Sequence, residues 1–407
     1  MSSQPSPARI LIYSHDSFGL GHLRRCRTIA HAIVEDPSGP SVLVLSGSPI
    51  IGSFDFQPRV DFVRVPGVIK LQNGEYSSLS LDMGIGELLS MRASIIKHTA
   101  EVFAPDVFIV DKEPLGLRGE IQSTLKMLKR RGTHLVLGLR DVMDDPDLLA
   151  TEWKRKNPIP ALSDLYDDIL IYGLPQICEP LSGIELNEKI NQKISYTGYL
   201  RRSSETPPTA FSTVGDSSNP YVLVTTGGGG DGEELIDWVL KAYETDPGIA
   251  LRAQLVFGPF MDQRKRDQFT ARVARLDRVE AITFDAHVEA RMKAAAGVVA
   301  MGGYNTFCEI LSFDKPAIIV PRTRPRMEQQ IRASRAEELG LVRMLEADAF
   351  LDPVPMAEAL KALVHQNRPS EVVVPGLLEG LDNIRRLVSL WTSKPRQRDQ
   401  SRQRVRV

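Results

Sequence analysis

The sequence predicts an α/β protein made of two doubly wound, Rossmann-like domains that face each other across a cleft. The chain has 407 residues, more than one hydrophobic core usually supports, so two domains are expected. Short runs rich in Val, Ile and Leu alternate with longer amphipathic stretches, which is the pattern of parallel strands covered by helices on both faces. A segment rich in Ser, Thr and Pro, residues 201–220, divides these strands into two sets.

The strands expected before this segment are RILIYS, SVLVLSG, DFVRVP, DVFIVD, HLVLGLR and DILIYG, with helices near 22–35, 82–102 and 118–131. Those expected after it are YVLVTTG, LRAQLVFG, VEAITF, GVVAMGG, PAIIVP and LVRML. In open parallel sheets, ligands bind beyond the carboxyl ends of the strands. The loops that follow these strands are therefore the candidate sites.

The composition shifts along the chain predict the domain boundaries. We expect a disordered N-terminus over 1–8, a first domain over 9–200, a linker over 201–219, a second domain over 220–374, a helix over 375–392 that returns to the first domain, and a disordered basic tail over 393–407. The charge of the tail favours a solvated segment and is compatible with weak attraction to anionic lipid.

The overall charge and the cysteines exclude several classes of protein. Lys and Arg number 50 against 51 Asp and Glu, a formal net charge of -1, which disfavours a nucleic-acid partner. Cys26, Cys178 and Cys308 are far apart, so buried thiols in a reducing compartment are expected, with neither structural zinc nor disulfides. No apolar run is long enough to cross a bilayer, and the N-terminal MSSQPSPAR lacks the apolar centre of a signal peptide, so a cytoplasmic protein is expected.

The first strand is followed by FGLGHLRRCRTIA, in which Gly19 and Gly21 permit a tight turn and His22 begins a helix above the strand ends. The N-terminus of a helix disfavours the protonated imidazole, so a neutral His22 could act as a general base. The alternative is an ordinary residue of the first helical turn.

The second domain opens with VTTGGGGDGEEL, where four glycines follow a strand and precede a helix beginning near Asp231. Their backbone N–H groups can approach a phosphate closely, with help from the helix dipole. These glycines are Gly227, Gly228, Gly229 and Gly230. The acidic residue of a dinucleotide fingerprint is missing after the next strand, LVFGPF, so NAD is disfavoured. A simple tight turn is the alternative.

A second glycine loop, MGGYNTFCEI, suits a nucleotide. Gly302 and Gly303 end a strand, and Asn305 or Thr306 is expected to cap the following helix and offer N–H groups to a diphosphate. Glu309, about one turn into the helix, can accept two hydrogen bonds from the vicinal hydroxyls of a ribose. The alternative is a capped helix in which Glu309 is a solvated acid.

The loop after the next strand, PRTRPRMEQQ, pairs a carboxylate with an amide. Glu328 and Gln329 offer the mixed acceptors and donors that sugar hydroxyls need, unless they are only the polar start of a helix. The loop also carries three arginines that could meet phosphate, Arg322, Arg324 and Arg326.

Further polar residues follow strands of the first domain. In VFIVDKEPLG, Asp111, Lys112 and Glu113 could orient an acceptor hydroxyl, and Asp111 could assist the base. GLRDVMDDPDLL holds a cluster of four aspartates, Asp141, Asp144, Asp145 and Asp147. These carboxylates could bind a metal, but the pattern DDPDLL is more typical of the start of a helix. In the second domain, His287 follows a strand and could border a nucleotide pocket.

Together these motifs resemble the two-domain GT-B glycosyltransferases, especially the branch that contains the bacterial lipid-linked N-acetylglucosaminyltransferase of peptidoglycan synthesis, with a family 28-like C-terminal domain. The resemblance covers roughly residues 9–390 and includes GLGH, the glycine loop of the second domain, MGGYNTFCEI, PAIIVP and EQQIRA. YSHDSFGLGHLRR, VDKEPLG and LRD are also similar to a group of bacterial predicted glycosyltransferases. The Asn-Ala that follows the sugar-reading pair in the family is Arg332-Ala333 here.

The resemblance implies a sugar transfer from a nucleoside-diphosphate donor, UDP above others, to an acceptor hydroxyl, with inversion and without a metal or other cofactor. It implies that His22 is the base and that the donor is bound by Gly21, Gly227 to Gly230, Gly302, Gly303, Asn305, Thr306, Glu309, Glu328 and Gln329. The acceptor is left open as a glycan, a lipid-linked molecule or a small molecule, and the location as cytoplasmic or peripheral to the inner membrane.

Two alternatives remain at this point. GLGHLRRCRTIA is also similar to the nucleotide-sugar hydrolase of pseudaminic acid synthesis, in which the histidine activates water, so a hydrolase or a 2-epimerase is one alternative. A non-catalytic protein that binds nucleotide sugars is the other. The longer first domain of this chain leaves room for an acceptor and favours transfer.

Overall fold

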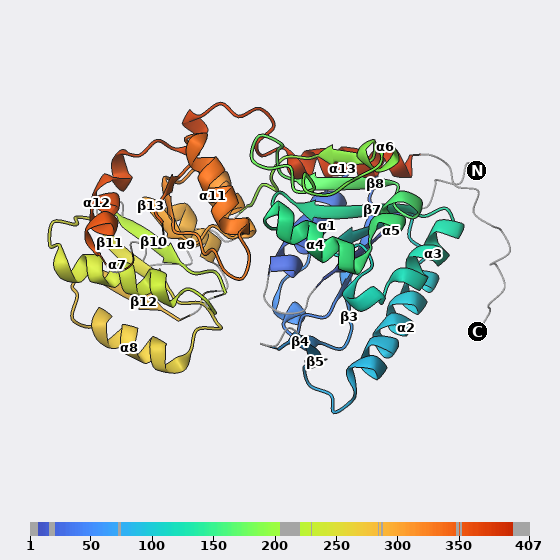
Figure 1. The fold of residues 1–407 in the computed structure, drawn as a ribbon, viewed down its shortest axis with the longest axis horizontal. Coiled ribbons are helices and arrows are strands. Elements are labelled where there is room, and N and C mark those ends of the chain that lie inside the picture. The colour runs from blue at the N-terminus through green and yellow to red at the C-terminus, as the bar shows by residue number, and fades with distance from the viewer. Residues whose placement is uncertain are drawn as a thin grey trace.

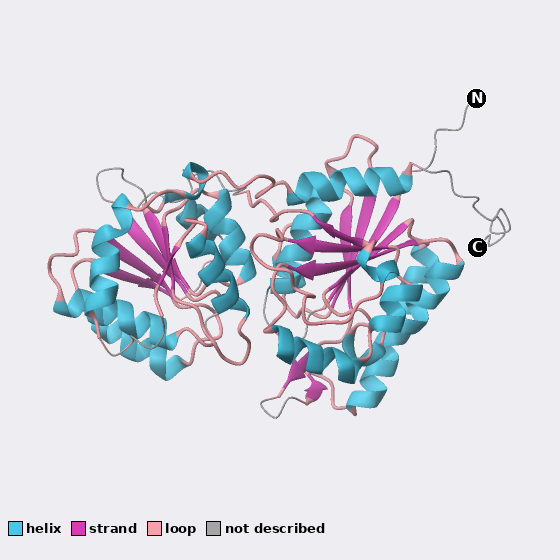
Figure 2. Cartoon of the chain, turned by 45° about the horizontal axis from the view of Figure 1, so that its top comes forward, coloured by secondary structure: helices cyan, strands magenta, loops and turns pink. Residues whose placement is uncertain are grey.

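The computed structural model describes residues 7–15, 21–71, 75–203, 220–228, 230–283, 285, 288–346, 350 and 352–393. Two α/β units lie side by side, one built from the first half of the chain and the other from the second (Figure 1). Each contains a parallel sheet with helices on both faces (Figure 2), so the predicted fold class is confirmed.

The first sheet, within the described residues, has the strand order β3-β2-β1-β6-β7-β8-β9 and is parallel throughout. Its strands are β1 Arg9–Ser14, β2 Ser41–Ser46, β3 Val60–Arg64, β6 Val107–Asp111, β7 His134–Arg140, β8 Asp168–Tyr172 and β9 Ile194–Tyr196. Strand β9 and the antiparallel hairpin of β4 (Val68–Lys70) and β5 (Tyr76–Ser78) are not predicted by the sequence pattern. Each of these strands has three residues, too few for a periodic pattern.

The helices of the first unit are α1 Gly21–Val34, α2 Ile85–Phe103, α3 Gln122–Arg130, α4 Pro146–Lys156, α5 Ile159–Asp164 and α6 Glu188–Asn191. The start of α4 confirms the reading of DDPDLL as a helix start. Asp145 is the N-cap, its side chain accepts hydrogen bonds from the amides of Asp147 and Leu148, and Pro146 occupies the first turn.

The second sheet, in the described residues, has the order β12-β11-β10-β13-β14-β15, again parallel. Its strands are β10 Tyr221–Thr225, β11 Arg252–Val256, β12 Val279–Ile282, β13 Gly297–Ala300, β14 Ala317–Ile319 and β15 Arg343–Met344. Its helices are α7 Glu233–Thr245, α8 Gln263–Val273, α9 Val288–Ala294, α10 Tyr304–Ser312, α11 Glu328–Glu338 and α12 Val354–Ala362. Single 3₁₀ turns occur at η1 Ile51–Ser53, η2 Leu117–Gly119, η5 Leu363–His365 and η6 Pro369–Glu371.

The central strands are buried on both faces, which is why they read as continuous apolar runs. Every residue of β6 and of β10 is buried. The hydrophobic cores of the two units meet at Tyr199, whose ring contacts that of Phe307 edge to face at 5.2 Å between centroids. The two units therefore share an apolar interface beneath the cleft.

The last helix, α13 (Gly380–Thr392), leaves the second unit and packs against α1 (Figure 1). The hydroxyl of Ser389 donates a hydrogen bond to Asp36, and the ring of Trp391 stacks on His134 with centroids 4.6 Å apart. The chain thus crosses between the units twice, once before β10 and once before α13.

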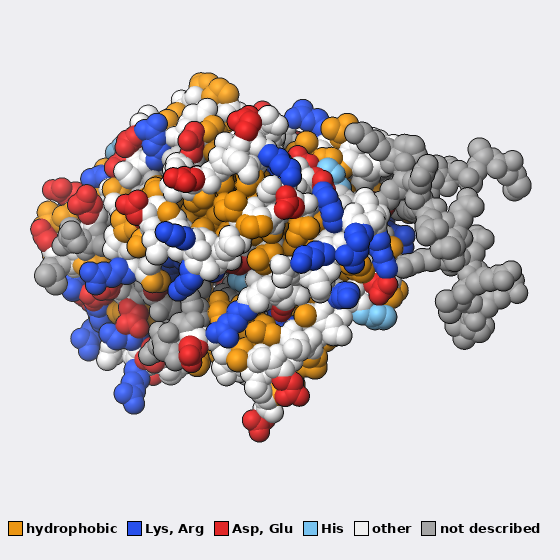
Figure 3. Space-filling model, turned by 45° about the vertical axis from the view of Figure 1, so that its right-hand side comes forward, with side chains coloured by type: hydrophobic (Ala, Val, Ile, Leu, Met, Phe, Trp, Pro, Cys, Tyr) orange, Lys and Arg blue, Asp and Glu red, His pale blue; other side chains and the backbone are white. Residues whose placement is uncertain are grey.

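The face of the molecule shown in Figure 3 carries acidic and basic side chains interspersed with one another, in keeping with the net charge of -1. Among the described residues, no helix combines the length and the apolar character needed to cross a membrane. Most of the expected N-terminal segment, of the linker and of the basic tail lies outside the described residues.

Candidate active site

The carboxyl ends of the strands in both sheets open onto a cavity of about 1150 Å³ between the two units. Its lining includes His22 and the described residues predicted to bind the donor: Gly21, Gly227, Gly228, Gly230, Gly302, Gly303, Asn305, Thr306, Glu309, Glu328 and Gln329. The other candidates of the first unit are not part of this lining, namely Asp111, Lys112, Glu113, Asp141, Asp144, Asp145 and Asp147. Gly19, Gly229 and His287 lie outside the described residues. The sequence motifs from the two halves of the chain therefore meet at one cavity.

His22 stands in the first turn of α1, as its position after Gly21 predicts, with its side chain 17% exposed. Its Nδ1 lies 2.5 Å from Oδ2 of Asp111, at the end of β6. Since a carboxylate only accepts, the protonated Nδ1 of the neutral imidazole donates a hydrogen bond to Asp111, which leaves Nε2 unprotonated. Arg25, one turn along α1, holds the same carboxylate through Nε and Nη2, both at 2.8 Å.

The electrostatics keep this pair as a neutral imidazole and a carboxylate. Burial lowers the pKa of His22 to about 4, although the charge and hydrogen bond of Asp111 oppose this and Arg25 reinforces it. Burial opposes ionisation of Asp111, but Arg25 and His22 hold its pKa well below the usual range. At neutral pH, His22 can therefore accept a proton.

The second glycine loop, at Gly302 and Gly303, has a backbone conformation that only glycine adopts without strain. Gly302 has φ +78°, and a Cβ there would lie 2.7 Å from Cγ2 of Ile319, so only glycine fits. The expected cap is wrong in one respect: Gly303 is the N-cap of α10, without a side-chain hydrogen bond, and Asn305 and Thr306 lie inside the first turn. Because no side chain caps this helix, the backbone N–H groups of its first turn are left to hydrogen-bond a ligand in the cavity.

Two of the expected nucleotide ligands are held by residues of the first unit. The carboxylate of Glu309, only 2% exposed, accepts a hydrogen bond from Arg24 of α1 at 2.5 Å. Arg24 also pairs with Glu289. The side-chain amide of Asn305 donates to the carbonyl of Gly21 at 3.0 Å. The N-terminus of α1 therefore contacts the helix expected to bind a nucleotide.

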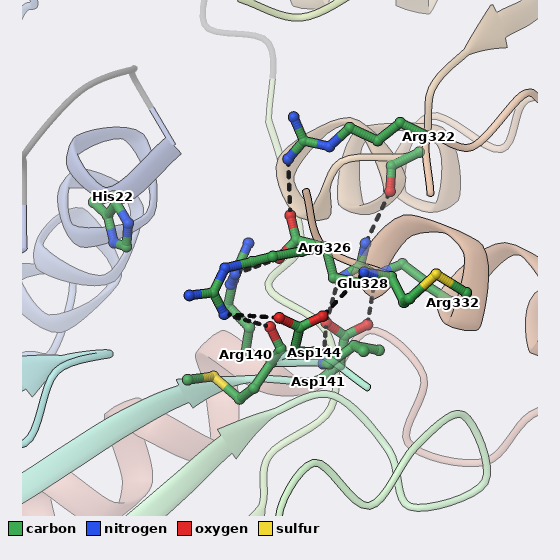
Figure 4. A network of polar contacts seen from close by, with 12 residues as sticks. His22, Arg140, Asp141, Asp144, Arg322, Arg326, Glu328 and Arg332 are labelled. Carbon is green, nitrogen blue, oxygen red and sulfur yellow. Dashed lines mark hydrogen bonds and ion pairs between the residues drawn. The ribbon is translucent and has the colours of Figure 1, made fainter. Parts of the chain in front are cut away.

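Glu328 and Gln329 begin α11, and Glu328 belongs to a network of ion pairs (Figure 4). Glu328 accepts from Arg140 of β7 at 2.5 Å and from Arg322 at 3.4 Å. Burial would raise the pKa of Glu328, but the surrounding cations, Arg140 first, lower it to about 2. Gln329 accepts a hydrogen bond from the amide of Arg322 at 3.1 Å.

The residue that departs from the family pattern, Arg332, forms a buried ion pair in this structure. Its guanidinium binds both oxygens of Asp141 at 2.7 Å, with side chains 1% and 0% exposed (Figure 4). It also donates to the carbonyl of Gly302 at 2.9 Å. Arg332 thus joins the glycine loop to the LRD motif of the first unit.

The aspartate cluster of the first unit is used structurally. Asp141 binds Arg332, and Asp144 accepts a hydrogen bond from the amide of Met327 at 3.0 Å and forms an ion pair with Arg326 at 3.3 Å (Figure 4). No cluster of His, Cys, Asp and Glu that could hold a metal occurs in the part of the chain that the structure describes.

Sequence reasoning missed the arginines that organise the cleft. Arg24, Arg25, Arg140 and Arg332 each bind a carboxylate that was itself a candidate. One signal was available, because His22 and Arg25 are three residues apart and so share a helix face. The other pairings join distant parts of the chain and have no local signature.

Comparison with known proteins agrees with this geometry. Residues 222–371 match the model of the glycosyltransferase family 28 C-terminal domain. A protein of Methanosarcina acetivorans named as an uncharacterized glycosyltransferase is 28% identical over 402 residues, covering 91% of this chain and 95% of its own length.

Solved structures share the fold at low identity. The glycotransferase of kitacinnamycin aligns with a TM-score of 0.60 at 15% identity over 95% of this chain and 96% of its own. MurG of Acinetobacter baumannii aligns with a TM-score of 0.58 at 10% identity over 95% of this chain and 100% of its own. The chain therefore has the two-domain fold of the GT-B glycosyltransferases, and its residues 222–371 carry a glycosyltransferase family 28 C-terminal domain.

Proposed function

We propose that the protein transfers a sugar from a UDP-sugar to an acceptor hydroxyl, with inversion and without a metal. The observation that carries the proposal is the hydrogen bond from Nδ1 of His22 to Asp111 at the edge of the cavity. It fixes the tautomer in which Nε2 is free to take the proton of the acceptor hydroxyl. Asp111 then stabilises the imidazolium that forms.

The transfer is a direct displacement. The acceptor oxygen forms its bond to the anomeric carbon while the bond from that carbon to the diphosphate oxygen breaks, and UDP leaves with the electron pair. The acceptor proton goes to Nε2 of His22. Since the proposed base lies on the first unit and the proposed donor site on the second, attack from the face opposite the leaving group would invert the anomeric centre.

The second domain supplies the groups that would hold the donor. The N-terminus of α10 at Gly303 and the glycine loop at Gly228 offer backbone N–H groups to the diphosphate. These dipoles, with nearby arginine side chains, would stabilise the charge of the leaving group, which is the reason to propose a metal-independent reaction. Glu309 would take the ribose, and Glu328 with Gln329 the sugar hydroxyls.

Donor binding by Glu309 would have to accommodate Arg24. One carboxylate oxygen, Oε1, accepts a hydrogen bond from Arg24 in this structure, so the ribose hydroxyls would share the carboxylate with that guanidinium or displace it. In either case the positive charge of Arg24 could meet the diphosphate. We propose on the same grounds that the first domain binds the acceptor, because His22 and Asp111 belong to it.

Two measurements test the proposal. Thermal stability against UDP, GDP, dTDP and CDP sugars should show a selective rise with a UDP-sugar, about 2.7 kcal/mol at a ligand concentration of 100 times Kd. Glu309→Ala should abolish that rise, and absence of any shift with the wild type would refute the donor site. Release of UDP should then depend on an acceptor and on His22, with His98→Ala, an exposed histidine of α2, as the control.

The alternative activities give different results in the same assay. A hydrolase or an epimerase would turn over the donor without an acceptor, and a binding protein would show the thermal shift but no turnover. The contact with the inner membrane expected from residues 393–407 lies outside the described residues and is no part of the proposal.

A further inference from the structure

The aromatic ring of Tyr304, the first residue of α10, contacts two arginine side chains. Cζ of Arg25 lies 5.5 Å from the ring centroid, and Cζ of Arg332 lies 5.8 Å from it. Tyr304 is only 4% exposed and lines the cavity. An aromatic face attracts a guanidinium at this distance, and the attraction is stronger when both groups are shielded from water. The ring therefore helps to hold both cations in place.

These two arginines bind carboxylates at the carboxyl ends of neighbouring strands. Arg25 binds Asp111, the last residue of β6, through Nε and Nη2, both at 2.8 Å. Arg332 binds Asp141, which follows β7, with both contacts at 2.7 Å. Strands β6 and β7 pair in parallel in the first sheet. One ring of the second unit thus contacts the cations that neutralise two buried carboxylates of the first unit.

Through Arg25, the ring of Tyr304 connects the proposed donor helix to the proposed base. Gly303, directly before Tyr304, is the N-cap of α10, the helix end proposed to meet the diphosphate. Arg25 binds Asp111, which accepts the hydrogen bond from His22 at 2.5 Å. An arginine side chain has many rotamers, so a stacking contact in addition to the carboxylate restricts where its guanidinium lies.

We propose that Tyr304 is a positioning residue for the transfer reaction. Its ring holds the guanidinium of Arg25 against Asp111, and this fixes the pair of Asp111 and His22 relative to the N-terminus of α10. The inference rests on the proposed function, in which α10 binds the donor and His22 takes the proton of the acceptor. Tyr304 acts through Arg25, and its hydroxyl has no part in the proposal.

Two substitutions separate the ring from the hydroxyl. Tyr304→Phe keeps the aromatic face and should leave kcat within about twofold of the wild type. Tyr304→Leu removes the face and should lower kcat about tenfold, the effect of losing one such contact away from water, while the affinity for UDP stays unchanged. An unchanged kcat in Tyr304→Leu, or an equal loss in both variants, would overturn the proposal.

The pKa of His22 reports on the position of Arg25. Burial lowers that pKa to about 4, and Arg25 and Lys112 reinforce the effect, whereas Asp111 opposes it. His15 also faces His22, edge to face with 5.6 Å between the ring centroids. Of these groups, Arg25 makes the contact with the ring of α10.

Titration of His22 therefore gives a readout that needs no turnover. The imidazole signal is followed by NMR in the full-length protein labelled at histidine, and comparison with His22→Gln assigns it. Loss of the ring admits water and loosens Arg25, so Tyr304→Leu should raise the pKa of His22 by about one unit. Tyr304→Phe should leave that pKa as in the wild type.

Phe307→Leu is the matched control for a loss of packing. Phe307 lies one turn further along α10, is equally buried, and contacts the ring of Tyr199 edge to face. Its substitution should lower Tm, as Tyr304→Leu does, but leave the pKa of His22 unchanged. If both leucine variants shift that pKa equally, or if neither shifts it, Tyr304 has a structural role alone and the proposal is wrong.

The two readouts distinguish failure of this inference from failure of the proposed function. A wild type that transfers no sugar from any UDP-sugar would refute the proposed function, yet the pKa of His22 in the variants would still report whether Tyr304 positions Arg25. Transfer by the wild type, with kcat and the pKa both unchanged in Tyr304→Leu, would support the proposed function and overturn the inference.

Discussion

The buried ion pair between Arg332 and Asp141 makes the most direct prediction about stability. The substitution Arg332→Met leaves the carboxylate of Asp141, which is 0% exposed, without its cationic partner. Asp141 would still accept hydrogen bonds from the Tyr199 hydroxyl at 2.7 Å and from the Val142 amide at 2.8 Å. Breaking a buried pair in this way typically costs about 3–5 kcal/mol, because the remaining charge has lost its compensation. For domains of this size, that corresponds to a fall in Tm of roughly 6–20 °C.

The double substitution Arg332→Met with Asp141→Leu gives the sharper result. It removes both charges together, so most of the loss should be recovered, and the two single effects should not add. Scanning calorimetry of the four proteins measures this, with Lys361→Met as a control, since Lys361 pairs with Asp246 at the surface. Single substitutions that leave Tm within one degree of the wild type, or a double substitution that loses the sum of both, would refute the role of the pair.

Three further predictions concern the cleft. Asp111→Asn should lower kcat by about 10²–10⁴-fold with UDP binding unchanged, because His22 loses the partner that fixes its tautomer; an unchanged kcat in a transfer assay would contradict this. The acid limb of the pH profile of kcat/KM for the donor should lie near pH 4, where His22 becomes protonated. The acid limb of kcat should lie at a higher pH, because the negative charge of a bound diphosphate favours the imidazolium. An acid limb near pH 6.5 in kcat/KM would count against His22 as the base. Gly302→Ala should lower Tm, since the added Cβ meets Ile319 at φ +78°, whereas Gly303→Ala, with nothing within 4 Å, should not; equal Tm values would contradict the steric argument.

The same pKa bears on stability. Folding lowers the pKa of His22 from 6.5 to about 4, so between these values the unfolded chain binds the proton and the folded one does not. Stability from this group is therefore complete above about pH 6.5 and is lost as the pH falls towards 4. Urea midpoints of the wild type and His22→Gln across this range measure the contribution, and identical pH dependence in the two proteins would exclude it.

Much of the fold follows from local patterns in the sequence. The twelve expected strands are present because buried parallel strands need continuous apolar runs, and α4 begins at Asp145 because Asp and Pro favour a helix start. The glycine loops after β10 and β13 were also predictable, since only glycine tolerates the backbone that Gly302 adopts. The short strands β4, β5 and β9 were not, because three residues show no period.

The sequence by itself determined which side chains stand at the ends of strands, and so which residues face the cleft. Only the tertiary structure decided how they pair: Asp111 with His22 at a separation of 89 residues, Asp141 with Arg332 at 191 and Glu309 with Arg24 at 285. An ion pair depends on the distance and burial that packing creates, and neither is encoded in local composition.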